Sequence, residues 1–341
     1  MAEYPNGALK TLQNIELEDI EKIASLPYKW AELDNKTIMI SGGTGFIGSF
    51  LTEVIRYKNE KYGSNTRIIS LSRRGGISDS VVDFLKCDIT KPISYDGKVD
   101  YILHLASNTH PKQYAEDPVG TITTNVIGCD NLLQLAVEKK VAFLLASSVE
   151  IYGQGTEQAM DEHYCGYIDC NTARSGYNEA KRTCEALCQS YKKQYGIDIR
   201  IVRLARIFGA DKKHDTKAMS QFMDKAVAGE DIILKSKGNQ RFSYCYVADA
   251  VSGIIKVLLD GENGEAYNVS AEDDGLTLGG YAEYMAKLAG RKVVYQIKDD
   301  ESASRASYAL LDTSKLKQLG WKPLYTVKEG IERTYRIKSC K

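Results

Sequence analysis

The stretch Thr37-Ile-Met-Ile-Ser-Gly-Gly-Thr-Gly-Phe-Ile-Gly48 decides the fold of this chain. A short apolar run enters a glycine-spaced turn, and the turn opens an amphipathic stretch that continues past Phe50. Gly42 permits the sharp turn, Gly45 lets the backbone approach a pyrophosphate, and Gly48 lets helix and strand pack closely. The free N–H groups at the start of the helix then bind the phosphates. The expected dinucleotide-binding residues here are Gly42, Thr44, Gly45, Phe46, Ile47 and Gly48, and the alternative is an ordinary tight turn.

Strand-like and helical segments alternate from residue 36 onward. The strand-like runs are 37–41, 67–71, 101–105, 143–147 and 198–204, and the helical stretches include 45–59, 119–138 and 177–195. Such alternation is typical of a parallel sheet covered by helices on both faces. It predicts an α/β fold, a doubly wound parallel Rossmann sheet with a smaller C-terminal substrate-binding domain.

Three units are expected along the chain. The first is an N-terminal helical extension over residues 1–36. The second is a dinucleotide-binding Rossmann domain over 37–209 plus 241–263. The third is a substrate-binding domain over 210–240 plus 264–341. Apolar residues at near-helical spacing predict a helix over 15–26. The segments 242–249 and 250–259 predict one more strand and helix that return to the sheet.

Composition excludes several classes of protein. The chain has 341 residues, with Lys+Arg and Asp+Glu equal at 45 each, so no broad nucleic-acid footprint is expected. No apolar run is long enough for a membrane span, and the first residues lack a signal-peptide pattern. Eight cysteines without C-x-x-C spacing indicate reduced thiols in the cytoplasm. His163 and His214 lack a second ligand at metal-binding spacing, and no metal is expected.

Two further motifs support chemistry with a bound dinucleotide. Tyr177-Asn-Glu-Ala-Lys181 places a phenol and an ammonium one helical turn apart on one face. About thirty residues earlier, an apolar run ends at Ser147-Ser148-Val149-Glu150. Alone, Y-x-x-x-K would be a solvated helix pair. The order of glycine loop, serine and Tyr–Lys helix resembles the short-chain dehydrogenases/reductases (SDRs).

This resemblance gives the three residues distinct roles. Tyr177 is the expected acid/base on an alcohol hydroxyl, and Ser148 hydrogen-bonds the same oxygen. A free phenol has a pKa of about 10, so a value near neutrality needs about three units, roughly 4 kcal/mol. Lys181 and the positive charge of the nicotinamide are expected to supply that preference for phenolate.

The end of the second strand bears on which dinucleotide is bound. NAD sites place a carboxylate there, whereas basic residues bind the 2′-phosphate of NADP. Ser72 occupies the acidic position, and Arg73 and Arg74 follow it. NADP is therefore expected, with NAD as the alternative if the arginines form a solvated turn. The remaining expected cofactor contacts are Asp88, Ile89, Leu105, Ala106 and Ser107, along with Tyr177 and Lys181.

From residue 36 to 336 the chain resembles the extended SDRs that modify nucleotide sugars, the NAD-dependent epimerase/dehydratase family. The segment from His104 to Gly128 and the Tyr177 helix look like those of UDP-glucuronate decarboxylases, and 312–331 matches the C-terminal pattern of the wider family. The resemblance implies oxidation at sugar C4, chemistry on the 4-keto intermediate, and return of the hydride. The partner would be a nucleotide-diphosphate sugar.

Glu150 and several departures from the family pattern bear on the reaction. The resemblance implies that Glu150 removes the C5 proton, and the alternative is a structural role. Val149 replaces the Asp of many dehydratases and the Ser of decarboxylases. Arg206 replaces a family Asn, and Arg241 lies one residue before the place of a family phosphate-binding Arg, so the diphosphate is expected to contact Arg241 or Arg206. The expected substrate-binding residues are Asn108, Arg206, Arg241 and Arg305.

The sequence therefore predicts a cytoplasmic, homodimeric nucleotide-sugar enzyme that oxidises C4 and then eliminates, as a dehydratase or decarboxylase. The catalytic residues would be Ser148, Glu150, Tyr177 and Lys181. Three alternatives stay open. They are a nucleotide-sugar 4-epimerase, an NADPH-dependent carbonyl or keto-sugar reductase, and a non-catalytic dinucleotide-binding protein.

Overall fold

A seven-stranded parallel sheet forms the centre of the protein in the computed structural model, which describes residues 14–107, 116–211, 217–297 and 307–340. Each neighbouring pair of strands is parallel. The strand order is β3 (Val82–Lys86), β2 (Arg67–Ser72), β1 (Thr37–Ser41), β4 (Tyr101–His104), β5 (Ala142–Ser148), β6 (Ile199–Leu204) and β11 (Ala266–Val269). The order reverses between β1 and β4, which confirms the doubly wound fold and places a ligand crevice at that point.

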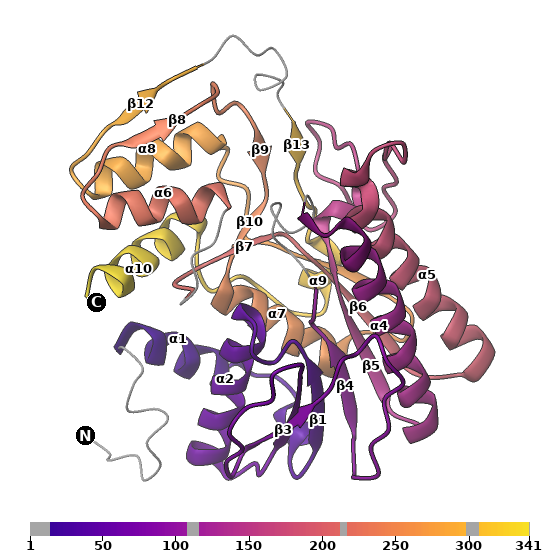
Figure 1. Ribbon diagram of the computed structural model, residues 1–341. Helices are drawn as coiled ribbons and strands as arrows, with labels where there is room; N and C mark the ends of the chain where they lie inside the picture. The colour runs from indigo at the N-terminus through magenta and orange to yellow at the C-terminus, as the bar shows by residue number, and fades with distance from the viewer. Residues whose placement is uncertain (1–13, 108–115, 212–216, 298–306, 341) are drawn as a thin grey trace.

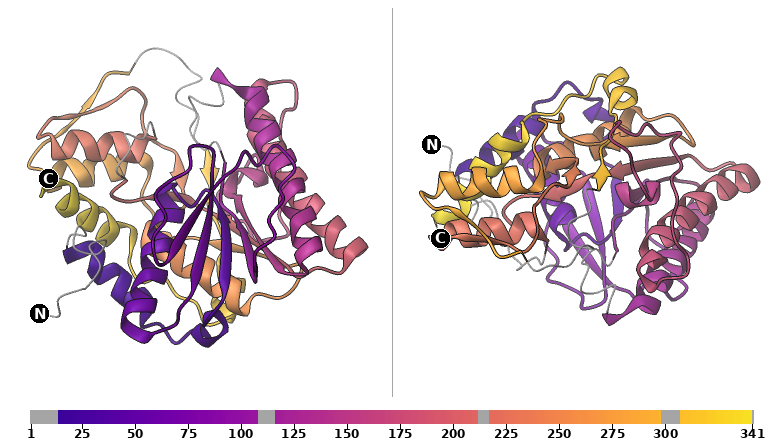
Figure 2. Two further views of the ribbon diagram at one scale, coloured as in Figure 1. Left: turned by 60° about the horizontal axis from the view of Figure 1, so that its bottom comes forward. Right: turned by 90° about the horizontal axis from the view of Figure 1, so that it is seen from above.

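Helices cover both faces of this sheet (Figures 1 and 2). Strand β1 illustrates why both faces need a cover. Its Met39 packs into one buried cluster, whereas Ile38 and Ile40 pack into another. Alternate side chains of a strand point to opposite faces, so both faces need an apolar cover. The covers are α4 (Pro118–Lys139) with α5 (Gly176–Tyr195) on one face, and α2 (Phe46–Tyr62) with α7 (Val247–Asp260) on the other.

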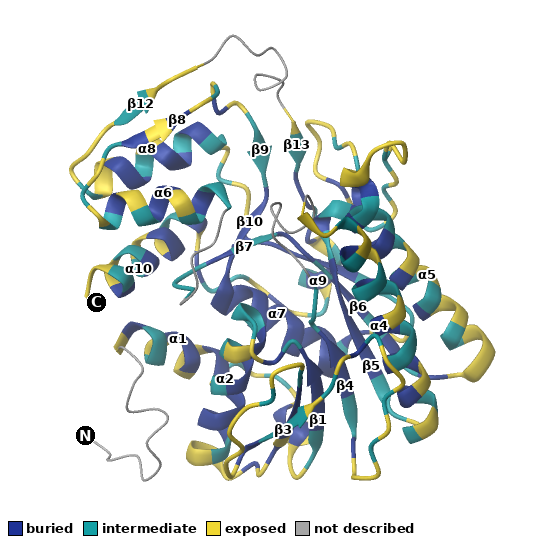
Figure 3. Ribbon diagram, in the orientation of Figure 1, coloured by how far each residue is buried: buried dark blue, intermediate teal, exposed yellow. Residues whose placement is uncertain are grey.

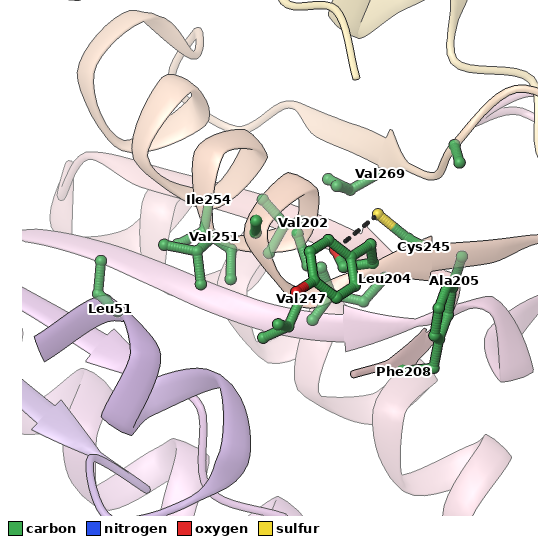
Figure 4. Packing of buried hydrophobic residues seen from close by; sticks show 14 of the residues in the cluster. Leu51, Val202, Leu204, Ala205, Phe208, Cys245, Val247, Val251, Ile254 and Val269 are labelled. Atoms are coloured by element: carbon green, nitrogen blue, oxygen red, sulfur yellow. Dashed lines mark hydrogen bonds between the residues drawn. The ribbon is translucent and has the colours of Figure 1, made fainter. Parts of the chain in front are cut away.

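The face under α2 and α7 holds the larger core. In Figure 4, Val251 and Ile254 of α7 lie beside Val202 of β6, with Leu51 of α2 next to them. All four side chains are almost inaccessible to solvent. Figure 3 shows the same pattern for the whole molecule, with buried strands at the centre and exposed residues on the outer faces of the helices. The position of the glycine loop is therefore fixed by a rigid core.

A second lobe lies beyond the end of the sheet (Figure 1). Three helices and a two-stranded sheet build it: α6 (Ala218–Val227), α8 (Leu278–Leu288), α10 (Val327–Ser339), β8 (Ile232–Leu234) and β12 (Val293–Tyr295). Two short parallel pairs run between the lobes: β7 (Arg206–Phe208) with β10 (Tyr244–Tyr246), and β9 (Arg241–Phe242) with β13 (Tyr308–Ala309). The short helix α9 (Ser314–Gln318) packs near β11.

The structure corrects one expected sheet connection. Residues 242–249 do not return to the central sheet, because β10 pairs with β7 instead. The seventh strand is β11, which pairs with β6 through residues that include the buried Tyr267 and Val269. The sheet thus extends past the expected boundary at residue 263. The helix expected over 250–259 is present as α7 and packs on β6.

The N-terminal extension contains the helix α1 (Asn14–Ala24), followed by a short 3-10 turn, η2 (Trp30–Leu33). Helix α1 packs against α2, α7 and α10. Its apolar face includes the buried Ile20 and Ile23, and the buried carboxylate of Asp19 pairs with Arg333 of α10 at 2.8 Å. The extension therefore joins the central domain to the C-terminal helix.

Candidate active site

The glycine loop has the tight geometry that a dinucleotide pyrophosphate requires. Gly42 has a φ of +81°, and a Cβ there would lie 2.7 Å from the backbone nitrogen of Ala106. A Cβ on Gly48 would overlap the carbonyl oxygen of Gly42. Neither position accepts a side chain without a shift of the backbone. Helix α2 begins at Phe46, so its first N–H groups face the loop.

A cavity of about 270 Å³ adjoins this loop at the ends of β1 and β2. Its lining contains many of the residues expected around the cofactor: Gly42, Thr44, Gly45, Ser72, Arg73, Arg74, Asp88, Ile89, Leu105, Ala106 and Ser107. Arg73 and Arg74 are exposed at its rim. Hydrogen bonds from Thr90 lower the pKa of Asp88, so this cavity also contains an ionised carboxylate. The residues and the loop geometry together fit the adenosine half of a dinucleotide.

The larger cavity, of about 410 Å³, lies between the two lobes. It is lined by Gly42, Gly45, Phe46, Ile47, Gly48, Leu105 and Ser107 of the cofactor side and by Ser148, Glu150, Tyr177 and Lys181. Strand β5 ends at Ser148, the 3-10 turn η3 (Val149–Tyr152) carries Glu150, and α5 carries Tyr177 and Lys181. The structure thus brings all four expected catalytic residues to one cavity.

Two serines hold the phenol of Tyr177. Its hydroxyl hydrogen-bonds with Ser148 and Ser107, and Ser107 donates to the side-chain oxygen of Asn125 at 2.9 Å. Lys181 is buried below the phenol, and its Nζ donates to the carbonyl oxygen of Ala146 at 2.8 Å. Ser107 was expected only as a cofactor contact, so its position beside Tyr177 is a further finding.

The protein's own groups do not favour the phenolate. Burial raises the pKa of Tyr177 to about 12, and its hydrogen bonds with Ser148 and Ser107 offset this only in part. Burial also lowers the pKa of Lys181, because a buried ammonium loses its hydration. The expected decrease to neutrality therefore does not come from the residues around the phenol.

Glu150 and Arg206, which the sequence assigned to different tasks, form an ion pair. Nη2 of Arg206 lies 3.1 Å from Oε1 of Glu150. The side-chain amide of Asn178 donates to the other carboxylate oxygen at 3.2 Å and to the backbone oxygen of Glu150 at 2.7 Å. The guanidinium of Arg206 also stacks on the ring of Phe242, 3.8 Å from its centroid. Arg206 is thus placed beside the expected catalytic residues.

The other expected substrate residues are distributed differently. Arg241 is not among the residues that line the large cavity, and it pairs with Asp273 at 2.5 Å. Asn108 and Arg305 lie outside the described residues. Three residues that belong to no motif of the sequence, Arg174, Lys217 and Tyr244, line the cavity from the α5 side and from the second lobe. Asn178 was not expected at the site either, although it lies directly after Tyr177 in the motif.

The described part of the chain contains no cluster of three or more His, Cys, Asp or Glu side chains arranged to hold a metal ion. Among the helices that the structure describes, none has the length and apolar character needed to cross a bilayer.

Residues 38–270 match the model of the NAD dependent epimerase/dehydratase family. The chain belongs to this family. UDP-glucuronic acid decarboxylase 5 of Arabidopsis thaliana is 33% identical over 321 residues, which cover 89% of this chain and 90% of that protein. These matches confirm the resemblance to extended SDRs that the motifs indicated.

Solved structures share the fold. UDP-glucuronic acid 4-epimerase from Bacillus cereus, in complex with NAD, aligns with a TM-score of 0.76 at 20% identity, covering 89% of this chain and 99% of that one. A dTDP-glucose 4,6-dehydratase from Streptomyces venezuelae with NAD bound aligns with a TM-score of 0.75 at 23% identity, covering 88% and 96%. Members with this fold therefore include both epimerases and dehydratases.

Proposed function

We propose that the protein modifies a nucleotide-diphosphate sugar by transient oxidation at C4, chemistry at C5, and reduction of the 4-keto intermediate. The observation that carries the proposal is the meeting of Ser148, Glu150, Tyr177 and Lys181 in one cavity, next to the dinucleotide loop. The chain belongs to the NAD dependent epimerase/dehydratase family. Its curated relatives are named UDP-glucuronic acid decarboxylases, and its structural neighbours act on UDP- and dTDP-sugars.

Each side chain has a definite task in this proposal. Tyr177 takes the proton from the C4 hydroxyl, and Ser148 hydrogen-bonds the same oxygen. NAD(P), when bound, accepts the C4 hydride, returns it later, and contributes a positive charge near the phenol. Lys181, held by Ala146, lies beneath the phenol as a second cation. In an elimination of water, Glu150 removes the C5 proton, which is acidic once C4 is a ketone; in a decarboxylation, Glu150 donates a proton to C5 after CO₂ has left that carbon.

Val149 bears on the type of elimination. Loss of water from C6 needs an acid for the leaving hydroxyl, and the side chain of Val149 is apolar and buried at the place where family dehydratases carry Asp. Loss of CO₂ from a 4-keto uronate needs no such acid, because the bonding electrons pass into the ketone and C5 then takes up a proton. This supports the decarboxylase type over the dehydratase type.

A 4-epimerase is the second candidate, and one observation favours it. Both carboxylate oxygens of Glu150 are held, one by Arg206 and one by Asn178. A carboxylate fixed in this way can serve as a binding residue of the pocket without taking part in proton transfer. Epimerisation at C4 needs only removal and return of the hydride, so it has no requirement for a base at C5.

Glu150→Gln separates the two functions. Substrates are first identified with a panel of UDP-, dTDP-, GDP- and CDP-sugars, read by mass spectrometry for loss of water, loss of CO₂ or unchanged mass. If C5 chemistry occurs, the variant should still oxidise C4, so reduced cofactor and a 4-keto sugar accumulate and deuterium uptake at C5 decreases. Glu179→Gln, on the same helix as Tyr177 but outside the cavity, is the matched control. Normal turnover and solvent exchange in Glu150→Gln would instead support the 4-epimerase.

We propose NADP as the cofactor in preference to NAD. Arg73 and Arg74 lie at the rim of the adenosine cavity, and Ser72 leaves the usual acidic position without a carboxylate. A guanidinium binds a 2′-phosphate bidentately, whereas Asp88 in the same cavity suits an unphosphorylated ribose or the adenine. Calorimetric titration of cofactor-free protein should show tighter binding of NADP, and the preference should decrease in Arg73→Ala. Equal or tighter binding of NAD would recast both arginines as surface charge.

A cytoplasmic homodimer completes the proposal. All eight cysteines are free thiols, as in proteins of reducing compartments. Helix α4 exposes Val119 and Ile122, with 70% and 42% of their surface accessible, and apolar side chains in this setting favour contact with a second copy. Light scattering should give twice the chain mass of 37.9 kDa. A mass of one chain at micromolar concentration would exclude the dimer.

A further inference from the structure

Arg206 brings a positive charge to the reacting end of the large cavity. Its guanidinium pairs with Glu150, and the charge of Glu150 is among the causes that raise the pKa of the Tyr177 phenol. Arg206 therefore lies on the side of the sugar that is oxidised. The diphosphate is attached to C1, which lies across the pyranose ring from C4. This position suits recognition of a substituent near C5 better than recognition of the diphosphate.

The guanidinium is held in one orientation and keeps one donor group unused. Phe242 stacks on it, and strand β7 fixes its backbone through a 3.2 Å hydrogen bond from Arg206 N to the carbonyl oxygen of Ser243. Nη2 is used by Glu150, whereas Nη1 is buried and has no hydrogen-bond partner among the described residues. A buried donor without an acceptor is unfavourable, because it has lost its hydration and gained no hydrogen bond. A ligand that brings an acceptor to Nη1 would supply that hydrogen bond.

The acceptor that fits is an anion. A neutral amide suffices to bind a sugar hydroxyl, and the family pattern has Asn at this position. A guanidinium adds a charge and a planar fork that matches a carboxylate. Without it, a carboxylate on the sugar would also be repelled by Glu150, since like charges in one site disfavour each other. A guanidinium between two carboxylates removes that repulsion.

We propose that Arg206 is a specificity-determining residue, which bridges Glu150 through Nη2 and a carboxylate on the sugar ring through Nη1. The site then takes nucleotide sugars with an acidic sugar in preference to neutral ones. This inference rests on the proposed function, because it assumes a nucleotide sugar in the large cavity. It replaces the expected role of Arg206 as a contact of the diphosphate.

Binding to a protein that cannot turn over tests the inference. Calorimetry on NAD(P)-loaded Tyr177→Phe, with UDP, UDP-glucose and UDP-glucuronate as ligands, gives three dissociation constants for each variant. The parent should bind UDP-glucuronate at least about tenfold more tightly than UDP-glucose. Adding Arg206→Asn should abolish this preference and leave the affinity for UDP within about twofold, whereas Arg206→Lys should keep part of it. Lys235→Asn, which removes an exposed charge of the second lobe, should change nothing.

The outcomes separate the inference from the function on which it rests. If Arg206→Asn weakens UDP as much as UDP-glucuronate, Arg206 is a diphosphate contact and the inference is wrong. Equal affinity of the parent for UDP-glucose and UDP-glucuronate also overturns it, while the proposed function survives. If UDP, dTDP, GDP and CDP all fail to bind, the proposed function fails as well. Thermal unfolding of each variant shows whether a loss of binding reflects a loss of folding.

Discussion

Tyr177 combines burial with two hydroxyl partners, and this environment determines what it can do. With a pKa raised to about 12, the phenol is protonated over the whole physiological range. In this state it is a proton donor toward a 4-keto oxygen, which is the task required in the final reduction. Its task as a base requires a positive charge close to the phenol. Lys181, whose Nζ lies 6.0 Å from the centroid of the phenol ring, does not supply it alone, because the pKa of the phenol is about 12 with this ammonium in place.

Tyr177→Phe should abolish turnover and leave the cofactor bound. The variant loses the proton that moves at C4, whereas Gly42, Gly48 and the start of α2 still form the pyrophosphate site. Steady-state kinetics and calorimetry with the dinucleotide measure the two effects separately. Tyr195→Phe, at an exposed position of the same helix, is the control. If Tyr177→Phe retains more than about a tenth of the wild-type kcat, the activation free energy has risen by less than about 1.4 kcal/mol, and the catalytic assignment is wrong.

Sequence reasoning gives the proposed catalytic residues because their spacing is local. Tyr177 and Lys181 lie one turn apart in any helix, and Ser148 lies at the end of an apolar run. The pairing of Glu150 with Arg206 could not be read in the same way. It joins residues 56 positions apart and depends on how β7 continues past the end of β6. The hydrogen bond of Ser107 with Tyr177 likewise requires the relative position of two strand ends.

At the level of elements, five of the buried strands of the central sheet and the helices between them could be predicted to within a few residues, whereas β11 was missed. The expected run 37–41 is β1, and the stretch 177–195 is α5 with one more residue at its start. These elements are bounded by glycine turns and bury long apolar faces. Strand β3 was missed because it is an edge strand in which Val82 alone is fully buried. Its short, mixed sequence has no apolar run to detect.

The turn that carries Glu150 is supported by a buried network that the sequence does not reveal. Arg203 of β6 pairs with Glu185 of α5 at 2.7 Å and donates to the hydroxyl of Tyr152 at 3.0 Å. Tyr152, which ends η3, in turn donates to Asn268 of β11 at 2.6 Å. Strand β11 is thus joined directly to the turn that carries Glu150, through the hydrogen bond between Tyr152 and Asn268. This explains why the seventh strand belongs with the catalytic domain although it follows β10 and α7 in the chain.

In the whole molecule, a buried polar junction joins the extension, the central domain and the C-terminal helix. Asp19 of α1 accepts a hydrogen bond from Tyr246 at 2.7 Å and pairs with Arg333 of α10. Next to it, Asp249 in the first turn of α7 accepts a hydrogen bond from the backbone N–H of Leu324, and its second carboxylate oxygen has no partner among the described residues. Helix α1 contacts both α7 and α10, and Figure 1 shows it below α10 at the left of the protein. The junction is therefore a place where protonation can affect the stability of the whole fold.

Asp249 should make the folded protein less stable as the pH rises. Burial raises its pKa to about 7, and the nearby charge of Asp19 adds to this. In the unfolded chain an Asp titrates at about 4, so between these values the folded state binds the extra proton. The stabilisation that this bound proton gives to the folded state is complete below about pH 4 and is lost as the pH rises through about 7. Relative to Asp249→Asn, which does not titrate, the wild type should therefore lose free energy of unfolding from pH 5 to 8.

Urea unfolding of the wild type and Asp249→Asn at pH 5, 6, 7 and 8 measures this difference. Part of the difference between the free energies of unfolding of the two proteins should be constant at every pH, because the NH₂ group of the new amide finds no acceptor where the unpaired carboxylate oxygen of Asp249 lies. The prediction concerns the change of that difference with pH, which should amount to a few kcal/mol in favour of the variant at pH 8. Asp96→Asn, at an exposed site, should show an offset independent of pH over this range. Parallel pH profiles for the wild type and Asp249→Asn would mean that Asp249 is already ionised in the folded protein, with the N–H groups at residues 324–325 sufficient to hold its charge.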